Sequence, residues 1–480
     1  MKKAKSIMFQ GTGSGVGKSV ICAGFCRLLA RRGVRVAPFK SQNMALNSGV
    51  AAGGEMGRAQ ILQAEAAGIE PDVRMNPILL KPQGNAVSQL IRMGKPVGTY
   101  SAREYYTLHE TNLETAIEAY ESLAKEYDVI VIEGAGSPAE INLQRTDIVN
   151  MRTADFAEAP VYIIGDIDRG GVFAWMKGTY DLLPRGSRHR VKGFIINRFR
   201  GDISLLEPGI DMFEEMVKVK IAGTVPMLNL TLEEEDSQNI KNSAKGGFVT
   251  VAVVKLARMS NFSDFAPLAA SPDINLIYAK SPNELTGADI IIIPGSKSTV
   301  SDMIDLRMRG FDKKIKQMSG ATPIIGICGG FQMLGKTIND PEGIEGEVKE
   351  TEGLGLLNMS TVITPEKTLL NREYTGQSIL KDIKFRGYEI HMGISETSSA
   401  YEQLVSEKDI CIADTKNKVV GTYIHGLFDS ENVMSALTAL SGKNISPDYS
   451  YYNNKMSQLD LLADTLEQCL DIEHILSDLH

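Results

Sequence analysis

The segment Ser6–Ser19, SIMFQGTGSGVGKS, decides the fold of the first half of this 480-residue chain. It begins as a short apolar run and continues as a glycine-rich loop from Gly11 to Ser19. An amphipathic stretch then runs to about Arg32. A strand, a glycine-rich loop and a helix in this order are the context of a phosphate-binding loop. Backbone N–H groups of such a loop, together with the helix N-terminus, can hold phosphate oxygens. The segment therefore predicts a nucleotide-binding α/β domain.

Individual residues of this loop have the chemistry that ATP binding needs. We expect Lys18 to neutralise the β and γ phosphates and the Ser19 hydroxyl to ligate Mg²⁺. The standard spacing would put the first glycine at Thr12, but it lies one residue earlier, so the loop is one residue longer. The alternative is a glycine-rich turn with a solvated lysine, which the agreement of strand, loop and helix disfavours. The predicted ATP-binding residues of this segment are Gly11, Thr12, Gly13, Gly15, Gly17, Lys18 and Ser19.

Further apolar runs in the first half each end at a polar residue. These runs are Val34–Phe39 before Lys40, Val129–Ile132 before Glu133, Val161–Gly165 before Asp166 and Phe194–Ile196 before Asn197. Continuous apolar runs of this length are typical of central parallel strands, and ligands collect outside the carboxyl ends of such strands. The pattern predicts that the four polar residues lie at one binding edge.

Each of these residues has a predicted role and an alternative. Glu133 is the favoured carboxylate for Mg²⁺, with Asp166 as its competitor. Lys40 is placed to hold a substrate carboxylate and to offset charge on a transferring phosphoryl group, unless it is a surface lysine. Asn197 could hydrogen-bond adenine, although asparagine after a strand is also a common turn residue.

The second half of the chain contains a candidate cysteine nucleophile. The strand-like pattern restarts near Val249, and the run Ile324–Ile327 leads directly into Cys328. Gly326–Gly330 is a G-x-C-x-G, the cysteine version of the nucleophile elbow, in which a strand turns sharply into a helix. At the helix N-terminus the dipole lowers the pKa of a thiol. A buried structural cysteine is the alternative, but it does not explain the paired glycines.

The partners of this nucleophile follow from the same geometry. The N–H of Gly329 is one predicted oxyanion donor, and the loop at Gly295 could supply the second. The general base should be a histidine. His425 follows a strand-like run and is the favoured candidate, with His391 as the runner-up.

Composition limits the classes of function. With 51 basic and 59 acidic residues the formal net charge is −8, and without a basic cluster the chain is a poor candidate for nucleic-acid binding. No window approaches 18 uninterrupted apolar residues, so we predict no membrane span, and the N-terminus does not read as a signal peptide. Five cysteines without metal-site spacing suggest free thiols and a cytoplasmic protein.

A polar stretch, Leu232–Gly247, ends in two glycines and is typical of a linker between domains. We predict domains at 1–235 and 248–445, a linker at 236–247 and a helical tail at 446–480. The tail has leucines at 459, 462, 466 and 470, which is a helical spacing. We expect this helix to dock on the second domain.

Eight stretches together resemble the cobyric acid synthase family of glutamine-dependent amidotransferases. The stretches are KSQNMALNS (Lys40–Ser48), GGEMGRAQ (Gly53–Gln60), MNPILLKP (Met75–Pro82), IEGAGSPAEINL (Ile132–Leu143), GDIDRGGVFA (Gly165–Ala174), INRFRGD (Ile196–Asp202), GICGGFQMLG (Gly326–Gly335) and GYEIHMG (Gly387–Gly393). The longer phosphate loop is similar to that of the dethiobiotin synthetase group. The resemblance implies an N-terminal P-loop NTPase domain of dethiobiotin-synthetase type and a C-terminal class-I-like glutamine amidotransferase domain.

The same resemblance implies a reaction. ATP and glutamine would be used to amidate the b, d, e and g carboxylates of adenosylcobyrinic acid a,c-diamide through acyl phosphates, with Cys328 releasing ammonia from glutamine. Because the corrinoid substrate is polyanionic, basic residues of the matching segments become candidates for binding it, and Glu55 becomes a further candidate for holding Mg²⁺. The candidate substrate residues are Arg58, Lys81 and Arg169, with Lys40, Arg74 and Arg198 as further members.

Two features are left open by the sequence. Related glutaminases have a glutamate two residues after the histidine, but this chain has Leu427 there, so the group that orients His425 is not identified. The function also has two rivals. One is a ligase of the same construction, similar to cobyrinic acid a,c-diamide synthase, and the other is a P-loop regulatory ATPase with a degenerate second domain. The oligomeric state is open as well.

Overall fold

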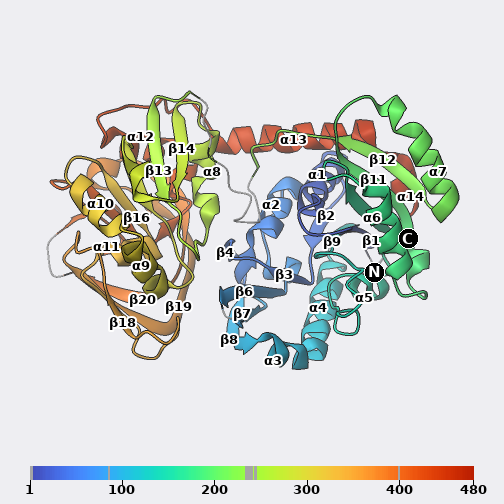
Figure 1. Ribbon diagram of the computed structural model, residues 1–480, viewed down its shortest axis with the longest axis horizontal. Helices are drawn as coiled ribbons and strands as arrows, with labels where there is room; N and C mark the ends of the chain where they lie inside the picture. Colours follow the sequence, from blue (N-terminus) through green and yellow to red (C-terminus); the bar gives the residue numbers. More distant parts are fainter. Residues whose placement is uncertain (1–3, 85–86, 233–241, 243–245, 398–400, 480) are drawn as a thin grey trace. The chain divides into compact units, whose positions relative to one another are not determined.

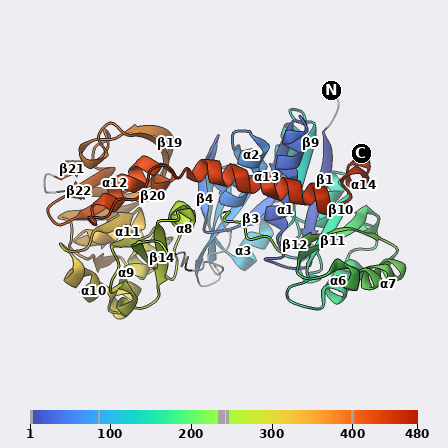
Figure 2. The same ribbon diagram turned by 90° about the horizontal axis from the view of Figure 1, so that it is seen from above.

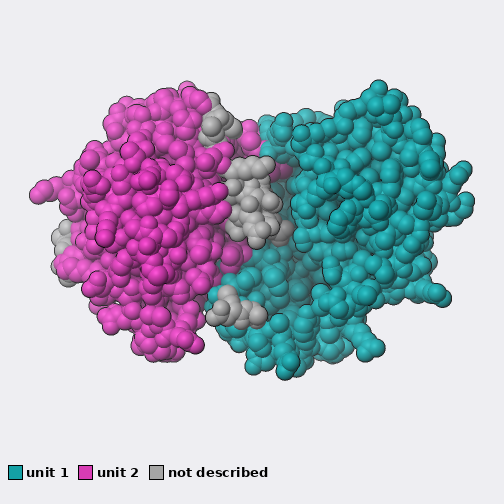
Figure 3. Space-filling view, viewed as in Figure 1, with its two compact units in different colours: residues 1–45, 51–230, 456–480 teal, residues 46–50, 231–455 magenta. Residues whose placement is uncertain are grey.

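The computed structural model describes residues 4–84, 87–232, 242, 246–397 and 401–479. Contacts divide the chain into two compact units, which Figure 3 shows in different colours. Unit 1 consists of Met1–Ala45, Ala51–Leu230 and Met456–His480, and unit 2 consists of Leu46–Val50 and Thr231–Lys455. Each unit has its own large sheet and its own core.

Unit 1 is built on a six-stranded parallel sheet with the order β12-β11-β10-β1-β9-β2 (Figure 1). Its strands are β1 (Lys5–Gly11), β2 (Val36–Phe39), β9 (Val129–Glu133), β10 (Val161–Asp166), β11 (Val191–Phe199) and β12 (Lys220–Pro226). The central strands β9 and β10 are buried along their whole length because helices cover both faces. These helices include α1 (Lys18–Arg31), α2 (Arg58–Ala67), α4 (His109–Leu123), α5 (Met151–Phe156), α6 (Val172–Leu182) and α7 (Glu207–Val217).

Strand register brings the predicted polar residues to one edge of this sheet. Glu133 is opposite Phe9 of β1, Asp166 is opposite Asn197 of β11, and Lys40 follows directly after β2. All these strands run parallel, so their carboxyl ends and the loop after β1 share one side of the sheet.

Smaller elements follow β2 in the chain, and of these Ser48–Val50 of β4 belong to unit 2. A four-stranded sheet has the order β3-β6-β7-β8, and two further short strands, β4 and β5, form a two-stranded sheet. The bounds are β3 (Gln42–Met44), β4 (Ser48–Ala51), β5 (Gly54–Gly57), β6 (Ile78–Gly84), β7 (Val87–Arg92), β8 (Lys95–Ser101) and α3 (Ala102–Thr107).

The C-terminal helices α13 (Tyr451–Cys469) and α14 (Ile472–Ser477) differ from the predicted docking. From Met456 onward they belong to unit 1, and not to the unit that contains Cys328. Figure 2 shows α13 running beside α1, and the Arg27 guanidinium forms an ion pair with Asp460 at 2.8 Å. Helical periodicity predicted the helix correctly, but it did not indicate which surface the apolar stripe covers.

Unit 2 contains a seven-stranded and a five-stranded sheet. Their orders are β14-β13-β15-β16-β23-β22-β21 and β18-β17-β19-β20-β24. The strands of the first are β13 (Val249–Val254), β14 (Ile274–Ala279), β15 (Ile290–Ile293), β16 (Ile324–Ile327), β21 (Glu402–Gln403), β22 (Cys411–Asp414) and β23 (Val419–Thr422). Those of the second are β17 (Thr337–Asn339), β18 (Glu350–Glu352), β19 (Met359–Thr375), β20 (Lys384–Thr397) and β24 (Ile424–His425). Helices α8 (Ala266–Ala270), α9 (Thr299–Met308), α10 (Phe311–Met318), α11 (Gly329–Leu334) and α12 (Glu431–Ala439) pack around them.

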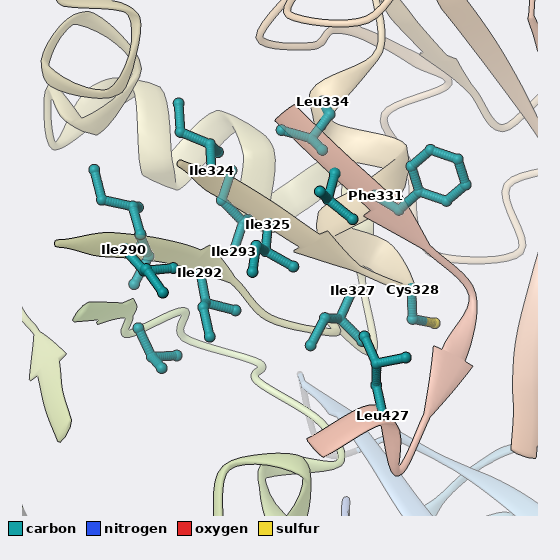
Figure 4. Packing of buried hydrophobic residues seen from close by; sticks show 14 of the residues in the cluster. Ile290, Ile292, Ile293, Ile324, Ile325, Ile327, Cys328, Phe331, Leu334 and Leu427 are labelled. Atoms are coloured by element: carbon teal, nitrogen blue, oxygen red, sulfur yellow. The ribbon is translucent and has the colours of Figure 1, made fainter. Parts of the chain in front are cut away.

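The core of unit 2 supports the position of Cys328. Isoleucines of β15 and β16 pack together with Phe331 and Leu334 of α11, as Figure 4 shows. Cys328 stands where β16 ends and α11 begins, at the border of this cluster. An apolar layer beneath a turn fixes the backbone of that turn, so the thiol has a defined direction.

The predicted α/β class with two sheet-based parts is confirmed, and the predicted strands from Ser6–Gln10 to Ile324–Ile327 are present. The predicted linker at 236–247 lies mostly outside the described residues. In the part of the chain that the structure describes, no helix is long and apolar enough to cross a membrane.

Candidate active sites

The phosphate-binding loop joins β1 to α1 in unit 1. Gly17 has a φ of 100°, a left-handed conformation that glycine adopts without strain, and a Cβ there would lie 2.3 Å from the Asn197 amide. Helix α1 then begins at Lys18, so the helix N-terminus faces the loop. The Lys18 ammonium donates to the carbonyls of Gly13 and Gly136 at 2.8 and 3.0 Å, which holds it across the loop.

Glu133 is the centre of the polar cluster beside this loop. Its side chain is fully buried and accepts hydrogen bonds on both oxygens. Oε1 accepts from Ser19 Oγ and from Lys40 Nζ, each at 2.8 Å. Oε2 accepts from the amides of Gln60 at 3.1 Å and Gln63 at 2.6 Å. A buried carboxylate that accepts from this many donors is held in one orientation.

Ser19 and Glu133 are suited to share one Mg²⁺ ion. Both offer oxygen, the ligand atom that Mg²⁺ prefers, and the two oxygens are 2.8 Å apart. Adjacent ligands of an octahedral Mg²⁺ are separated by about 2.9 Å when the metal–oxygen distance is near 2.1 Å. No group of three or more histidine, cysteine, aspartate or glutamate side chains suited to a metal occurs among the described residues.

The third predicted metal residue, Glu55, has a different environment. It is fully buried, and its Oε1 forms an ion pair of 2.6 Å with Lys81, which is itself buried. The structure thus brings together a predicted metal residue and a predicted substrate residue as a buried ion pair. Arg58, the first residue of α2, is half-buried.

Asn197 and Asp166 shape the loop region through the contacts of their side chains. The amide of Asn197 donates to the Val16 carbonyl at 2.8 Å, so it supports the backbone of the phosphate loop. Asp166 forms ion pairs with Arg198 at 2.8 Å and with Arg169 at 3.5 Å. Arg169 is 66% exposed, and its guanidinium lies against Gly15 of the loop. The structure thus sets Arg169, one of the three predicted substrate residues, beside the phosphate loop.

A cavity of about 770 Å³ opens beside the phosphate loop within unit 1. Its wall combines loop residues with aromatic and apolar side chains of the four-stranded sheet and its neighbours. It includes Ser14, Gly136, Met44, Leu80, Tyr100 and Tyr105. Arg152 is the arginine of this wall, and the predicted substrate residues Arg58, Lys81 and Arg169 do not contribute to it.

In unit 2 the nucleophile has the backbone of a strained elbow. Cys328 has φ 52° and ψ −110°, which an L-residue adopts only when the surrounding structure enforces it. Its N–H donates to the Thr422 carbonyl of β23 at 2.7 Å. A Cβ on Gly330 would lie 1.9 Å from the Ile293 carbonyl oxygen, so only glycine permits α11 to start this close to β15. The strain and the close approach fix the thiol at the carboxyl end of the sheet.

The histidine of this site is His425, at the end of β24. It is fully buried, and its Nδ1 is 2.7 Å from Oδ2 of Asp264. The other carboxylate oxygen of Asp264 accepts from the Gly426 N–H at 3.0 Å. Asp264 lies in a short 3-10 helix, Phe262–Phe265, and is therefore the group that orients His425.

Electrostatics assign the charge state of His425. Burial alone would lower its pKa, but the carboxylate of Asp264 and the side chain of Cys328 raise the pKa to about 10. The imidazole therefore carries a proton at neutral pH. A protonated histidine beside a cysteine stabilises the thiolate and can later give a proton to a leaving amine.

The predicted oxyanion donors lie close to this pair. A Cβ on Gly329 would be 2.9 Å from the N of Ser296, so the loop after β15 runs beside the start of α11. Gly295 lies near the imidazole, since a Cβ there would be 3.6 Å from its Cε1. The geometry brings Gly295, Gly329, Cys328 and His425 together.

His391, the alternative histidine, has different neighbours. Its ring stacks on Tyr423 with centroids 3.9 Å apart, and its Nε2 lies 3.5 Å from Glu389. Glu389 in turn accepts from Tyr374 at 2.8 Å. His391 and Glu389 of β20 thus lie in a cluster with Tyr374 of β19 and with Tyr423, whereas Asp264 contacts His425.

Comparisons with known proteins agree on the family. A model described as CobQ/CobB/MinD/ParA nucleotide binding domain matches residues 7–239, and one described as CobB/CobQ-like glutamine amidotransferase domain matches 250–433. The cobyric acid synthase of Ruminiclostridium cellulolyticum is 47% identical over 98% of this chain and 96% of its own. That of Clostridium tetani is 44% identical over 99% of both chains. The chain belongs to the cobyric acid synthase family. A solved glutamine amidotransferase structure also matches 40% of this chain and 99% of its own, at 17% identity and a TM-score of 0.33.

As a member of this family, the chain is an amidotransferase with a nucleotide-binding part and a glutamine amidotransferase part. The family resemblance inferred from the motifs is confirmed. Both rival functions are disfavoured, because the full-length relatives are cobyric acid synthases.

Sequence reasoning missed three polar residues of these sites. Asp264 has no motif around it, and its role depends on the tertiary approach of a distant 3-10 helix. Gln60 and Gln63 are three residues apart on α2, so they share one helix face, and this spacing was an available signal. The segment Gly53–Gln60 was noted for its resemblance, but neither Gln60 nor Gln63 was predicted to donate to Glu133.

Proposed function

We propose that this protein amidates the b, d, e and g carboxylates of adenosylcobyrinic acid a,c-diamide, using ATP and glutamine. One observation supports this proposal most: a single chain of this family contains two sites. One consists of Cys328, His425 and Asp264, and the other is the phosphate loop with the buried carboxylate of Glu133 beside it. The first site can release ammonia, and the second can activate a carboxylate to receive it.

The glutaminase half-reaction follows from the charges of the site. The Cys328 thiolate attacks the side-chain amide of glutamine, and the N–H groups near Gly295 and Gly329 stabilise the oxyanion. His425 then gives its proton to the departing nitrogen, so that ammonia leaves and a glutamyl thioester remains. Water hydrolyses the thioester to glutamate and returns a proton to the imidazole.

The synthetase half-reaction takes place at the phosphate loop. A substrate carboxylate oxygen attacks the γ-phosphorus of ATP, the bond to ADP breaks, and an acyl phosphate forms. Lys18 and Lys40 offset the charge on the transferring group. When bound, Mg²⁺ neutralises phosphate charge, and Ser19 and Glu133 are the residues that would hold it. Ammonia then attacks the acyl carbon, and phosphate departs as the amide forms.

The corrinoid would occupy the cavity beside the loop. Its volume is in the range of small-molecule sites, and its aromatic and apolar wall suits the face of a macrocycle. Ser14 and Gly136 border both the cavity and the loop, so a peripheral carboxylate could reach the phosphoryl group from there. We assign the protein to the cytoplasm, where ATP and glutamine are available and thiols stay reduced.

A product assay by mass spectrometry tests the proposal. Purified protein is incubated with adenosylcobyrinic acid a,c-diamide, Mg-ATP and glutamine, beside a Cys328→Ala variant given either glutamine or ammonium. Each amidation replaces OH with NH₂, so successive products form a ladder of equal mass decrements. We expect the wild type to complete the ladder with glutamine and the variant to do so only with ammonium. ATP hydrolysis without any change in corrinoid mass would reject the substrate assignment.

A further inference from the structure

Five residues from the first half of the chain are built into the glutaminase unit. Leu46–Val50 belongs by its contacts to unit 2, although the residues on both sides of it belong to unit 1. We call Leu46–Val50 the inserted segment. Its Asn47 and Ser48 are fully buried, which is unusual for polar residues of a connecting segment.

Hydrogen bonds join the inserted segment to the rest of unit 2. The Ser48 N–H donates to Oδ1 of Asn261 at 3.2 Å, and the Ser48 carbonyl accepts from the Tyr388 hydroxyl at 3.4 Å. The Ser263 hydroxyl donates to Oδ1 of Asn47 at 3.1 Å. These contacts hold Asn47 and Ser48 in place, and each partner residue lies close to the catalytic histidine.

The partner residues surround His425. Nδ2 of Asn261 lies 3.5 Å from its Nε2, and Tyr388 stacks on the ring with centroids 5.2 Å apart and planes 18° from parallel. Ser263 directly precedes Asp264, whose carboxylate holds Nδ1. The ring thus has a neighbour at each nitrogen and on one face. Asn261 and Tyr388 are hydrogen-bonded to the inserted segment, and Asp264 directly follows Ser263, which is hydrogen-bonded to it as well.

The orientation of the Asn261 amide has a consequence for the reaction. Because its Oδ1 accepts from the Ser48 N–H, its Nδ2 is the group that faces His425 Nε2. An N–H donor at that position stabilises the neutral imidazole, which is the state left after His425 gives its proton to ammonia. The reversed amide would present an acceptor, and it would leave the Ser48 N–H against a donor.

We propose that the inserted segment positions the catalytic histidine of the glutaminase, through Asn261, Tyr388 and the Ser263–Asp264 turn. These residues contact His425 or its carboxylate partner, so we assign them as positioning residues. The inference rests on the proposed glutaminase function. It makes glutamine hydrolysis depend on residues that the chain supplies from its nucleotide-binding half.

The chain on the N-terminal side of the segment leads directly to the synthetase site. Asn43 donates to Oε1 of Gln60 at 3.0 Å, and Gln60 donates to Glu133. Asn43 thus contacts a residue that holds Glu133, and this contact lies within unit 1.

The test loosens the segment without changing Cys328, His425 or Asp264. The double variant Ser263→Ala/Tyr388→Phe removes the hydrogen bonds that these two hydroxyls donate to the segment, and it keeps the aromatic ring on His425. The measured quantity is the ratio of the glutamine-dependent to the ammonium-dependent amidation rate, together with kcat and KM for glutamine. Ammonium-driven amidation is the internal reference, because it does not use His425.

We expect the ratio to fall about 5- to 20-fold through kcat, with KM for glutamine nearly unchanged, because a small misplacement of a catalytic group lowers the rate of the chemical step. The matched control, Ser263→Thr/Tyr388→Phe, keeps the hydroxyl at position 263 and should recover part of the loss. An unchanged ratio in the double variant, with wild type hydrolysing glutamine, overturns this inference alone. If wild type hydrolyses no glutamine at all, the proposed function fails, and the inference fails with it.

Discussion

At the scale of single residues, the charge of His425 is set by Asp264. The carboxylate holds Nδ1 at 2.7 Å, and with Cys328 it raises the pKa of the imidazole to about 10 against the effect of burial. Replacing Asp264 with asparagine keeps the shape but removes the negative charge. We expect glutamine hydrolysis to fall by about 100-fold or more, because loss of the orienting carboxylate is costly in comparable triads.

Steady-state glutaminase assays of Asp264→Asn and Asp264→Glu measure this effect. The glutamate variant keeps the charge on a longer side chain and should retain more activity than the asparagine variant. Ammonium-dependent amidation should be unchanged in both. Equal glutaminase rates in wild type and Asp264→Asn would show that another group orients His425.

The same pKa predicts how pH changes stability. The folded-state pKa of His425 is raised above the ordinary value of 6.5, so the folded state binds this proton more tightly than the unfolded chain does. The resulting stabilisation is fully present below about pH 6.5 and is lost as the pH rises to about 10. Thermal melts from pH 6 to pH 10 should show a steeper loss of Tm in wild type than in Asp264→Asn. Parallel curves of Tm against pH in the two proteins would contradict a raised pKa of His425.

The residue scale is also where the sequence was most and least informative. Cys328 is predictable because its glycines are local and the elbow cannot form without them. His425 is predictable because it ends a strand. Asp264 carries no local signal, since its role arises only when a 3-10 helix far away in sequence reaches β24. Local constraints leave a pattern in the sequence, and long-range contacts between single polar residues do not.

At the scale of elements, helix α13 shows what periodicity leaves undetermined. The leucine spacing predicted a helix with an apolar face, but any covered surface would satisfy that pattern. In the structure a Cβ on Gly24 of α1 would come within 2.5 Å of Leu466 and 2.8 Å of Leu462, so the two helices pack closely. Arg27, Arg31 and Arg32 of the α1 region pair with acidic residues of the tail at its edge.

This packing predicts that α13 stabilises the nucleotide-binding unit. Leu466 is fully buried, so Leu466→Ala should lower the free energy of unfolding by about 2–5 kcal/mol, through lost burial and the cavity left behind. Leu461 lies on the same helix but is 50% exposed, and Leu461→Ala should change it by less than about 0.5 kcal/mol. Denaturant unfolding curves, recorded with and without nucleotide, measure the free energy of unfolding of both variants. Equal effects of the two variants would show that the helix does not rely on this contact.

At the scale of the whole molecule, two chemistries are encoded in two units of one chain. Lys18 belongs to the phosphate loop of unit 1, and Cys328 belongs to the elbow of unit 2. Either side chain can therefore be replaced without changing the contacts around the other. Lys18→Ala should abolish amidation with either nitrogen source and keep glutaminase activity. Cys328→Ala should lose only the reaction with glutamine.

A mixture of these two variants then shows what the covalent connection contributes. Ammonia made by Lys18→Ala must enter the solution before Cys328→Ala can use it, and in neutral water most of it becomes ammonium, which is not a nucleophile. We expect the mixture, given glutamine, to amidate only after a lag in which ammonium accumulates, while wild type starts at once. Added glutamate dehydrogenase with its cosubstrates, which removes free ammonium, should suppress the mixture and spare wild type. A mixture that starts without a lag and resists this trap would mean that the two sites work equally well on separate chains.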